Sequence, residues 1–117
     1  MGEVFELHDY EVEVSEVKTF ENCKRQYDVI AKDDYSIIVD CKKWDNKRRI
    51  RHALKSAVED QMERVEKLEN SERKYPMIVT SSNSPVKFHR DVPVIPISKL
   101  NKFLSEFQVY KERLLYL

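Results

Sequence analysis

The fold of this chain is decided by residues 27–44, which read YDVIAKDDYSIIVDCKKW. Two apolar stretches, Gln26–Ala31 and Tyr35–Cys41, flank the pair Asp33-Asp34, which is a turn signal. The second stretch is rich in β-branched residues, which is typical of a strand buried on both faces. The two stretches therefore predict an antiparallel hairpin closed by a three-residue loop, residues 33–35.

Charged residues interrupt both predicted strands. Asp28 lies within the first, and Asp40 and Lys42 lie at the end of the second. Side chains alternate along a strand, so Asp40 and Lys42 share one face, and a three-residue loop brings Asp28 opposite Asp40. Charges are rarely buried in strands without a partner or a metal. Two carboxylates and the backbone carbonyl of Cys41 would offer Mg²⁺ or Mn²⁺ the oxygen ligands that it binds, and Lys42 would orient a metal-activated water.

The segments on either side of the hairpin predict further strands and helices. Val4–Val17 alternates and predicts one or two half-buried strands. After the hairpin a long amphipathic helix, with Asp45 and Asn46 as N-cap candidates, is expected to run to about Ser71.

The last third of the chain predicts two strands and a helix. The strands are Tyr75–Thr80 and Val92–Ile97, and two prolines make the second an edge strand or a strand that ends early. Ser98 is expected to cap the helix. The 117 residues thus predict one α/β domain, residues 1–117, with a mixed sheet flanked by helices in the order β-ββ-α-β-β-α.

The charge distribution favours a nucleic-acid partner more than the net charge does. The chain is neutral overall, but residues 42–55 hold seven Lys or Arg against one acid, Asp45. Such a patch is typical of a surface that contacts phosphates, and a solvated helix face is the alternative. The expected phosphate contacts are Lys43, Lys47, Arg48 and Arg51. No apolar run approaches the ~20 residues of a membrane span, and no signal peptide is recognisable, so a soluble cytoplasmic protein is expected.

Asp28 followed by Asp40-Cys41-Lys42 resembles the D…(D/E)-x-K signature of PD-(D/E)XK nucleases. Residues 27–44 are most similar to the Mrr-like restriction endonuclease and archaeal Holliday junction resolvase branches. The resemblance implies a restriction-endonuclease-like fold and Mg²⁺- or Mn²⁺-dependent hydrolysis of DNA in repair, recombination or restriction. In these branches the helix after the hairpin often carries a glutamine that points into the site, and Gln61 matches it. The implied catalytic residues are Asp28, Asp40, Lys42 and Gln61, and the implied metal ligands are Asp28, Asp40 and the Cys41 carbonyl.

The start of the chain departs from this family. These nucleases usually begin with a helix that contributes another acid, whereas here a strand is expected at once. Either a partner subunit supplies the helix, or the chain is a catalytically silent relative that binds nucleic acid or a partner protein. A homodimer is expected of an active enzyme, because cleavage of a duplex needs two sites. A structural ion pair of Asp28 or Asp40 with Lys42, and a Gln61 merely tolerated at the helix margin, remain alternatives.

The basic run predicts a steep dependence of DNA affinity on salt. Each phosphate contacted should contribute about −0.9 to the slope of log K against log salt, because binding releases counterions. The triple substitution of Lys47, Arg48 and Arg51 to alanine should weaken binding and flatten this slope in a fluorescence anisotropy titration. Salt-insensitive binding, or a variant that binds as the wild type does, would contradict the prediction.

Overall fold

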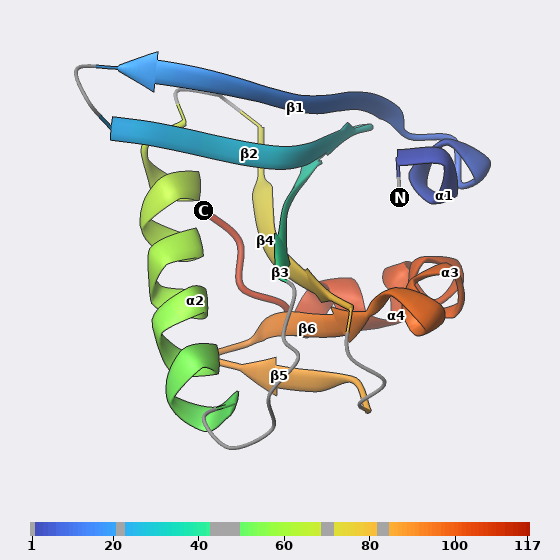
Figure 1. Ribbon diagram of the computed structural model, residues 1–117. Helices are drawn as coiled ribbons and strands as arrows, with labels where there is room; N and C mark the ends of the chain where they lie inside the picture. Colours follow the sequence, from blue (N-terminus) through green and yellow to red (C-terminus); the bar gives the residue numbers. More distant parts are fainter. Residues whose placement is uncertain (1, 21–22, 43–49, 69–71, 82–84) are drawn as a thin grey trace.

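The chain folds into a six-stranded mixed sheet covered by helices (Figure 1). A computed structural model describes residues 2–20, 23–42, 50–68, 72–81 and 85–117, and the side chains within 3–13, 29–42, 53–68, 72–81 and 85–117. The elements are α1 (Gly2–Leu7), β1 (Glu11–Phe20), β2 (Cys23–Lys32), β3 (Ser36–Lys42), α2 (Ile50–Glu66), β4 (Lys74–Thr80), β5 (Lys87–His89), β6 (Val92–Pro96), α3 (Ile97–Ser105), α4 (Phe107–Tyr110) and a 3₁₀ turn, Lys111–Arg113. The strand order is β1-β2-β3-β4-β6-β5, which confirms the expected α/β class and mixed sheet.

The hairpin predicted from residues 27–44 is confirmed. Lys32 pairs with Ser36, so the loop comprises Asp33, Asp34 and Tyr35, and the Asp33 N–H donates to the Tyr35 carbonyl at 2.8 Å. After β3 the chain crosses over through α2 and returns in β4, which pairs with β3 in parallel. β3 thus lies in the middle of the sheet, between one antiparallel and one parallel neighbour.

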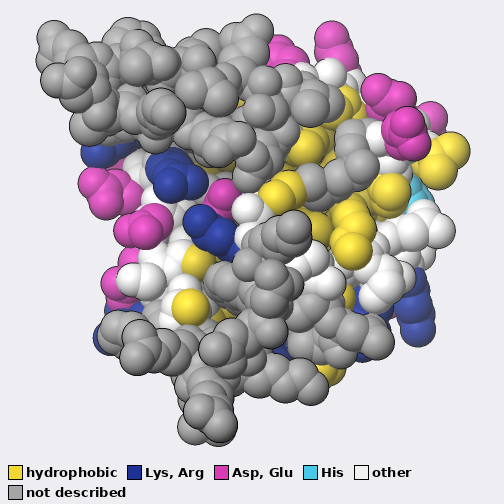
Figure 2. Space-filling view, viewed as in Figure 1, with side chains coloured by type: hydrophobic (Ala, Val, Ile, Leu, Met, Phe, Trp, Pro, Cys, Tyr) yellow, Lys and Arg dark blue, Asp and Glu magenta, His cyan; other side chains and the backbone are white. Residues whose placement is uncertain are grey.

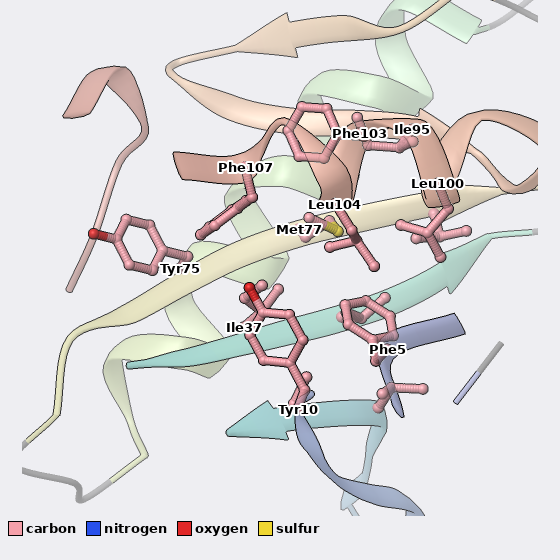
Figure 3. Close-up of a cluster of buried hydrophobic side chains, with 14 of the residues drawn as sticks. Phe5, Tyr10, Ile37, Tyr75, Met77, Ile95, Leu100, Phe103, Leu104 and Phe107 are labelled. Carbon is pink, nitrogen blue, oxygen red and sulfur yellow. The ribbon is translucent and has the colours of Figure 1, made fainter. Parts of the chain in front are cut away.

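The two faces of the sheet carry cores of different size. The larger lies under α1, α3 and α4, and it contains aromatic side chains from the sheet and from each of these three helices (Figure 3). On β3, Ile37 and Val39 belong to this core, so the alternate residues Ile38, Asp40 and Lys42 face α2 on the other side. The smaller core, under α2, comprises Ala57, Val58, Ile78, Val92 and Val94.

The expectation of a strand over Val4–Val17 is wrong at its start, because Gly2–Leu7 forms helix α1. Phe5 explains the helix: it is fully buried in the larger core, with its ring 6.0 Å from that of Tyr10. Asp9, at φ 65°, then turns the chain into β1, which begins at Glu11. The inference that the chain lacks a first helix is therefore also wrong.

The end of α2, the position of β6 in the sheet and the course of the last helix also differ from the sequence prediction. α2 ends at Glu66, not near Ser71, while Asp45 and Asn46 lie outside the described residues. β6 is not an edge strand, since β5 lies beyond it, although it does end at Pro96. The last helix is divided at Glu106.

Local hydrogen bonding accounts for two of these differences. The Ser105 hydroxyl donates to the Lys102 carbonyl at 2.6 Å, and such a bond to the preceding turn competes with the helix ladder. In the β5–β6 hairpin the two-residue turn makes His89–Val92 a hydrogen-bonded pair. The next pair, Phe88–Pro93, is then a non-hydrogen-bonded pair and needs no N–H from proline. β6 can therefore pair with β5 despite Pro93.

The C-terminal residues fill a gap in the sheet beside β4. β4 pairs with β6 only over Ile78–Thr80, and before that Leu117 exchanges two backbone hydrogen bonds with Lys74, at 2.9 and 3.0 Å. Alternate residues of a strand direct their backbone groups to the same side. Pro76 therefore directs its missing N–H into the interval between Leu117 and β6, so neither of these two pairings requires an N–H from Pro76.

A pair of tyrosines joins the turn between α1 and β1, the hairpin loop and α4. The hydroxyls of Tyr10 and Tyr35 lie 2.6 Å apart, and the Gln108 amide donates to the Tyr35 hydroxyl at 3.1 Å. The ammonium of Lys111 lies 4.4 Å from the centre of the Tyr35 ring. Burial raises the pKa of Tyr10 far above its ordinary value, and the hydrogen bond with Tyr35 adds to the rise. Burial also raises the pKa of Tyr35, although its two hydrogen bonds lower it in part.

These raised pKa values predict a loss of stability in alkali. Below the ordinary tyrosine pKa of about 10 the pair contributes fully, and as pH rises beyond it the unfolded chain releases protons that the folded chain retains. The free energy of unfolding should therefore fall by up to about 1.4 kcal/mol per pH unit for each tyrosine. Tyr10→Phe should have a smaller alkaline slope in urea denaturation at several pH values, and equal slopes would contradict this.

Candidate functional site

Asp40 is a nearly buried carboxylate held by two cations at the end of β3. Its side chain is 7% exposed, with the Lys42 ammonium 3.2 Å from Oδ2 and the Arg64 guanidinium 3.6 Å from Oδ1. Lys42 comes from the same strand and Arg64 from α2, so the cluster lies on the α2 face of the sheet. The two cationic side chains are 33% and 29% exposed, so the site opens to solvent on their side.

Gln61 ties α2 to the strand that carries Asp40. It is 1% exposed, and its Nε2 donates to the Ile38 carbonyl at 2.8 Å. The expected direction, toward the sheet, follows from this bond, because Ile38 is two residues before Asp40 on the same face of β3. The bond also explains a polar residue on the apolar stripe of α2, since a buried amide needs a partner.

Arg64 and Thr80 are neighbours of the site that the sequence did not indicate. Arg64 stands one turn after Gln61 on α2, where the charged positions look alike in sequence. Thr80 pairs in register with Lys42 across the parallel strands and is 2% exposed. Only a weak indication of Thr80 was present in the sequence. Thr80 ended the predicted strand Tyr75–Thr80, and that position alone does not mark a residue as part of a site.

The metal ligands expected from the sequence are described only in part. The register of β2 and β3 runs from Lys32–Ser36 to Val29–Val39, one position before the predicted Asp28–Asp40 pair. Asp28 lies in β2, but its side chain is outside the described residues. Among the side chains that are described, no group of three or more His, Cys, Asp or Glu could hold a metal ion.

The basic residues expected to contact phosphates also fall outside the description. Lys43, Lys47 and Arg48 are not described, and Arg51 is described only as backbone of α2. On the face drawn in Figure 2, acidic and basic side chains are mixed on the α2 side, while hydrophobic side chains gather on the opposite side.

The sequence matches no protein-family model and no curated protein. Within the described residues, no helix is both long and apolar enough to cross a membrane.

The buried Gln61 bond predicts a structural cost for its removal. Gln61→Leu keeps the size of the side chain but leaves the Ile38 carbonyl without this donor, so the free energy of unfolding should fall by about 1–2 kcal/mol. Gln108→Leu is the matched control, because Gln108 is exposed and should cost less. Equal stability losses in chemical denaturation would contradict a special role for the Gln61 bond.

Proposed function

We propose that this protein is a divalent-metal-dependent DNA nuclease of the PD-(D/E)XK type. The observation that carries the proposal is the placement of Asp40, Lys42 and Gln61. A nearly buried carboxylate and a lysine two residues later share one face of β3, and the glutamine of the next helix bonds to that strand. The resemblance drawn from the sequence implies this combination.

The order of elements supports the same proposal. The resemblance implies an initial helix, a hairpin with the motif, a long helix and a parallel strand, and α1, β2–β3, α2 and β4 follow that order. α1, however, packs against the larger core through Phe5, on the face of the sheet opposite to Asp40. Its glutamates, Glu3 and Glu6, are exposed there, so we do not assign the additional acid of the family to α1.

The donor set suits Mg²⁺ or Mn²⁺ if Asp28 joins it. Asp40 places carboxylate oxygens at the partly open end of β3, and Asp28 and the Cys41 carbonyl would complete a set of hard oxygen ligands. A bound divalent ion would activate water and neutralise charge that develops on the phosphate. Lys42 lies 3.2 Å from Asp40, and in this proposal it would orient that water and stabilise the same charge.

A catalytically silent relative is the second candidate, and the arrangement of charges at Asp40 favours it. In the described structure each Asp40 oxygen already has a cation beside it, as in a structural ion cluster. Burying one carboxylate among two cations is stabilising only when all are well paired, and removal of one partner is then costly. Such a protein would bind nucleic acid or another protein without cleaving DNA.

Substitution of Asp40 and Lys42 distinguishes the two candidates. Asp40→Asn removes a metal-binding charge and Lys42→Ala removes the cation beside the water, so each should lower DNA cleavage by about 10²-fold or more. Asp40→Asn leaves Lys42 and Arg64 partly exposed, so water can solvate them and we expect a stability loss of only about 1 kcal/mol. Lys42→Ala leaves Arg64 beside the nearly buried Asp40, so its effect on stability is expected to be the larger of the two.

Cleavage of linear, nicked and branched DNA with Mn²⁺ is the measurement, and thermal melting is its companion. Asp60→Asn is the matched control, because Asp60 is an exposed carboxylate on α2, and it should retain the wild-type rate. If the wild type cleaves none of these substrates and Asp40→Asn melts far below it, the silent candidate is correct and the nuclease is not.

A further inference from the structure

Phe88 is a large aromatic residue that remains half-exposed at the edge of the sheet. It lies in β5, the last strand of the sheet (Figure 1), and is 47% exposed. Its ring contacts Phe103 of α3 and Tyr110 of α4, with ring centres 6.3 and 5.9 Å away. Phe103 belongs to the larger core, so Phe88 lies on the face of the sheet opposite to Asp40.

The two neighbouring rings hold Phe88 in place without stacking on it. Phe103 and Tyr110 stack on each other, with 18° between their planes and 5.0 Å between their centres. Toward Phe88 the same two rings are tilted, by 47° and 33°. Neither ring therefore covers a face of Phe88 in parallel, and nearly half of this residue is in solvent. A ring that is held in this way can accept a further planar group by stacking.

The segment that carries this ring is basic. Residues 85–105 contain four Lys or Arg against one acid, Asp91, and the four are Lys87, Arg90, Lys99 and Lys102. Lys99 stands four residues before Phe103 on α3, and Lys102 stands three residues after Lys99, so helix geometry places the two lysines side by side on the flank that meets Phe88. Both are exposed. An exposed ring beside cations favours an anionic partner that carries planar groups.

The size of this surface favours a nucleic acid over a protein. β5 has only three residues and begins with Lys87, and a short edge strand with a lysine resists pairing with another strand. One exposed ring also offers far less area than the roughly 800 Å² that each partner buries in a stable protein interface. A base needs only one ring on which to stack, and its phosphate needs only a cation nearby. Bases present their faces when they are unpaired, so a single strand fits this surface.

We propose that Phe88, together with Lys99 and Lys102, forms a binding surface for single-stranded nucleic acid. A base stacks on the Phe88 ring, and the two lysines contact neighbouring phosphates without reading the sequence. This surface shares no residue with the cluster around Asp40 and needs no metal ion. The proposal therefore goes beyond the nuclease function and does not depend on it.

Fluorescence anisotropy with a labelled oligothymidylate of about 12 nucleotides, in EDTA, tests the stacking. Phe88→Leu keeps an apolar side chain against Phe103 and Tyr110 but has no ring, so it should weaken binding about 10-fold, the effect of one lost base stack. Phe88→Trp offers a larger ring and should bind at least as tightly as the wild type. Tyr116→Leu is the matched control, because Tyr116 is 50% exposed and packs on another core ring, and it should leave the affinity unchanged.

The double substitution of Lys99 and Lys102 to glutamine tests the phosphate contacts. With a single strand, each phosphate contacted contributes about −0.7 to the slope of log K against log salt, so the double variant should flatten this slope by up to about 1.4. Lys67→Gln is the control, because Lys67 is an exposed lysine just after α2, and it should leave the slope unchanged. Thermal melting of every variant shows that a change in binding is not a loss of folding.

Three results would overturn the proposal. The wild type does not bind the oligothymidylate, or Phe88→Leu binds it as tightly as the wild type, or a duplex of the same length loses as much affinity on this substitution as the single strand does. A mass in light scattering that falls from dimer to monomer in Phe88→Leu would also overturn it, because the surface would then join two copies of the chain. None of these outcomes changes the test of the nuclease, since Asp40 and Lys42 are left intact.

Discussion

β3 runs through the middle of the sheet with helices over both of its faces, and its first five residues, Ser36–Asp40, are all buried. Four of these five can be accommodated by packing or by a single hydrogen bond, but the fifth is a carboxylate. An ionised group at such a depth is costly unless opposite charges accompany it. On the α2 face, Lys42 from the strand itself and Arg64 from the helix supply these opposite charges. The packing of α2 is thus coupled to the charge of one residue on β3.

The same constraint links stability to the proposed chemistry. A cluster that is well paired without metal stabilises the folded chain, whereas a nuclease needs the Asp40 oxygens for an ion. The two demands conflict only if the cations are fixed, and Lys42 and Arg64 each keep about a third of the side chain in solvent. Partial exposure lowers the cost of separating them from Asp40, because water replaces the lost partner. Under the proposed function, the cluster would therefore stabilise the fold and still release Asp40 to an ion.

What the sequence predicted depended on the length of each pattern. The run of β-branched residues in β3 and the stripe on α2 repeat often enough to define strand, helix and the inward direction of Gln61. α1 has only six residues, which is fewer than two helical turns, so no apolar repeat can be recognised in it. Its formation depends on the burial of Phe5 by distant parts of the chain. Arg64 was missed for a related reason: only the packing of α2 on β3 determines which of its many charges reaches Asp40.

The pairing of Leu117 with Lys74 has a consequence for association between copies of the protein. Whenever this pairing opens, the side of β4 before Ile78 offers backbone groups to a strand of another molecule. Pro76 stands on this side and presents no N–H to such a strand. A proline within a buried strand thus disfavours edge-to-edge association during local opening of the fold.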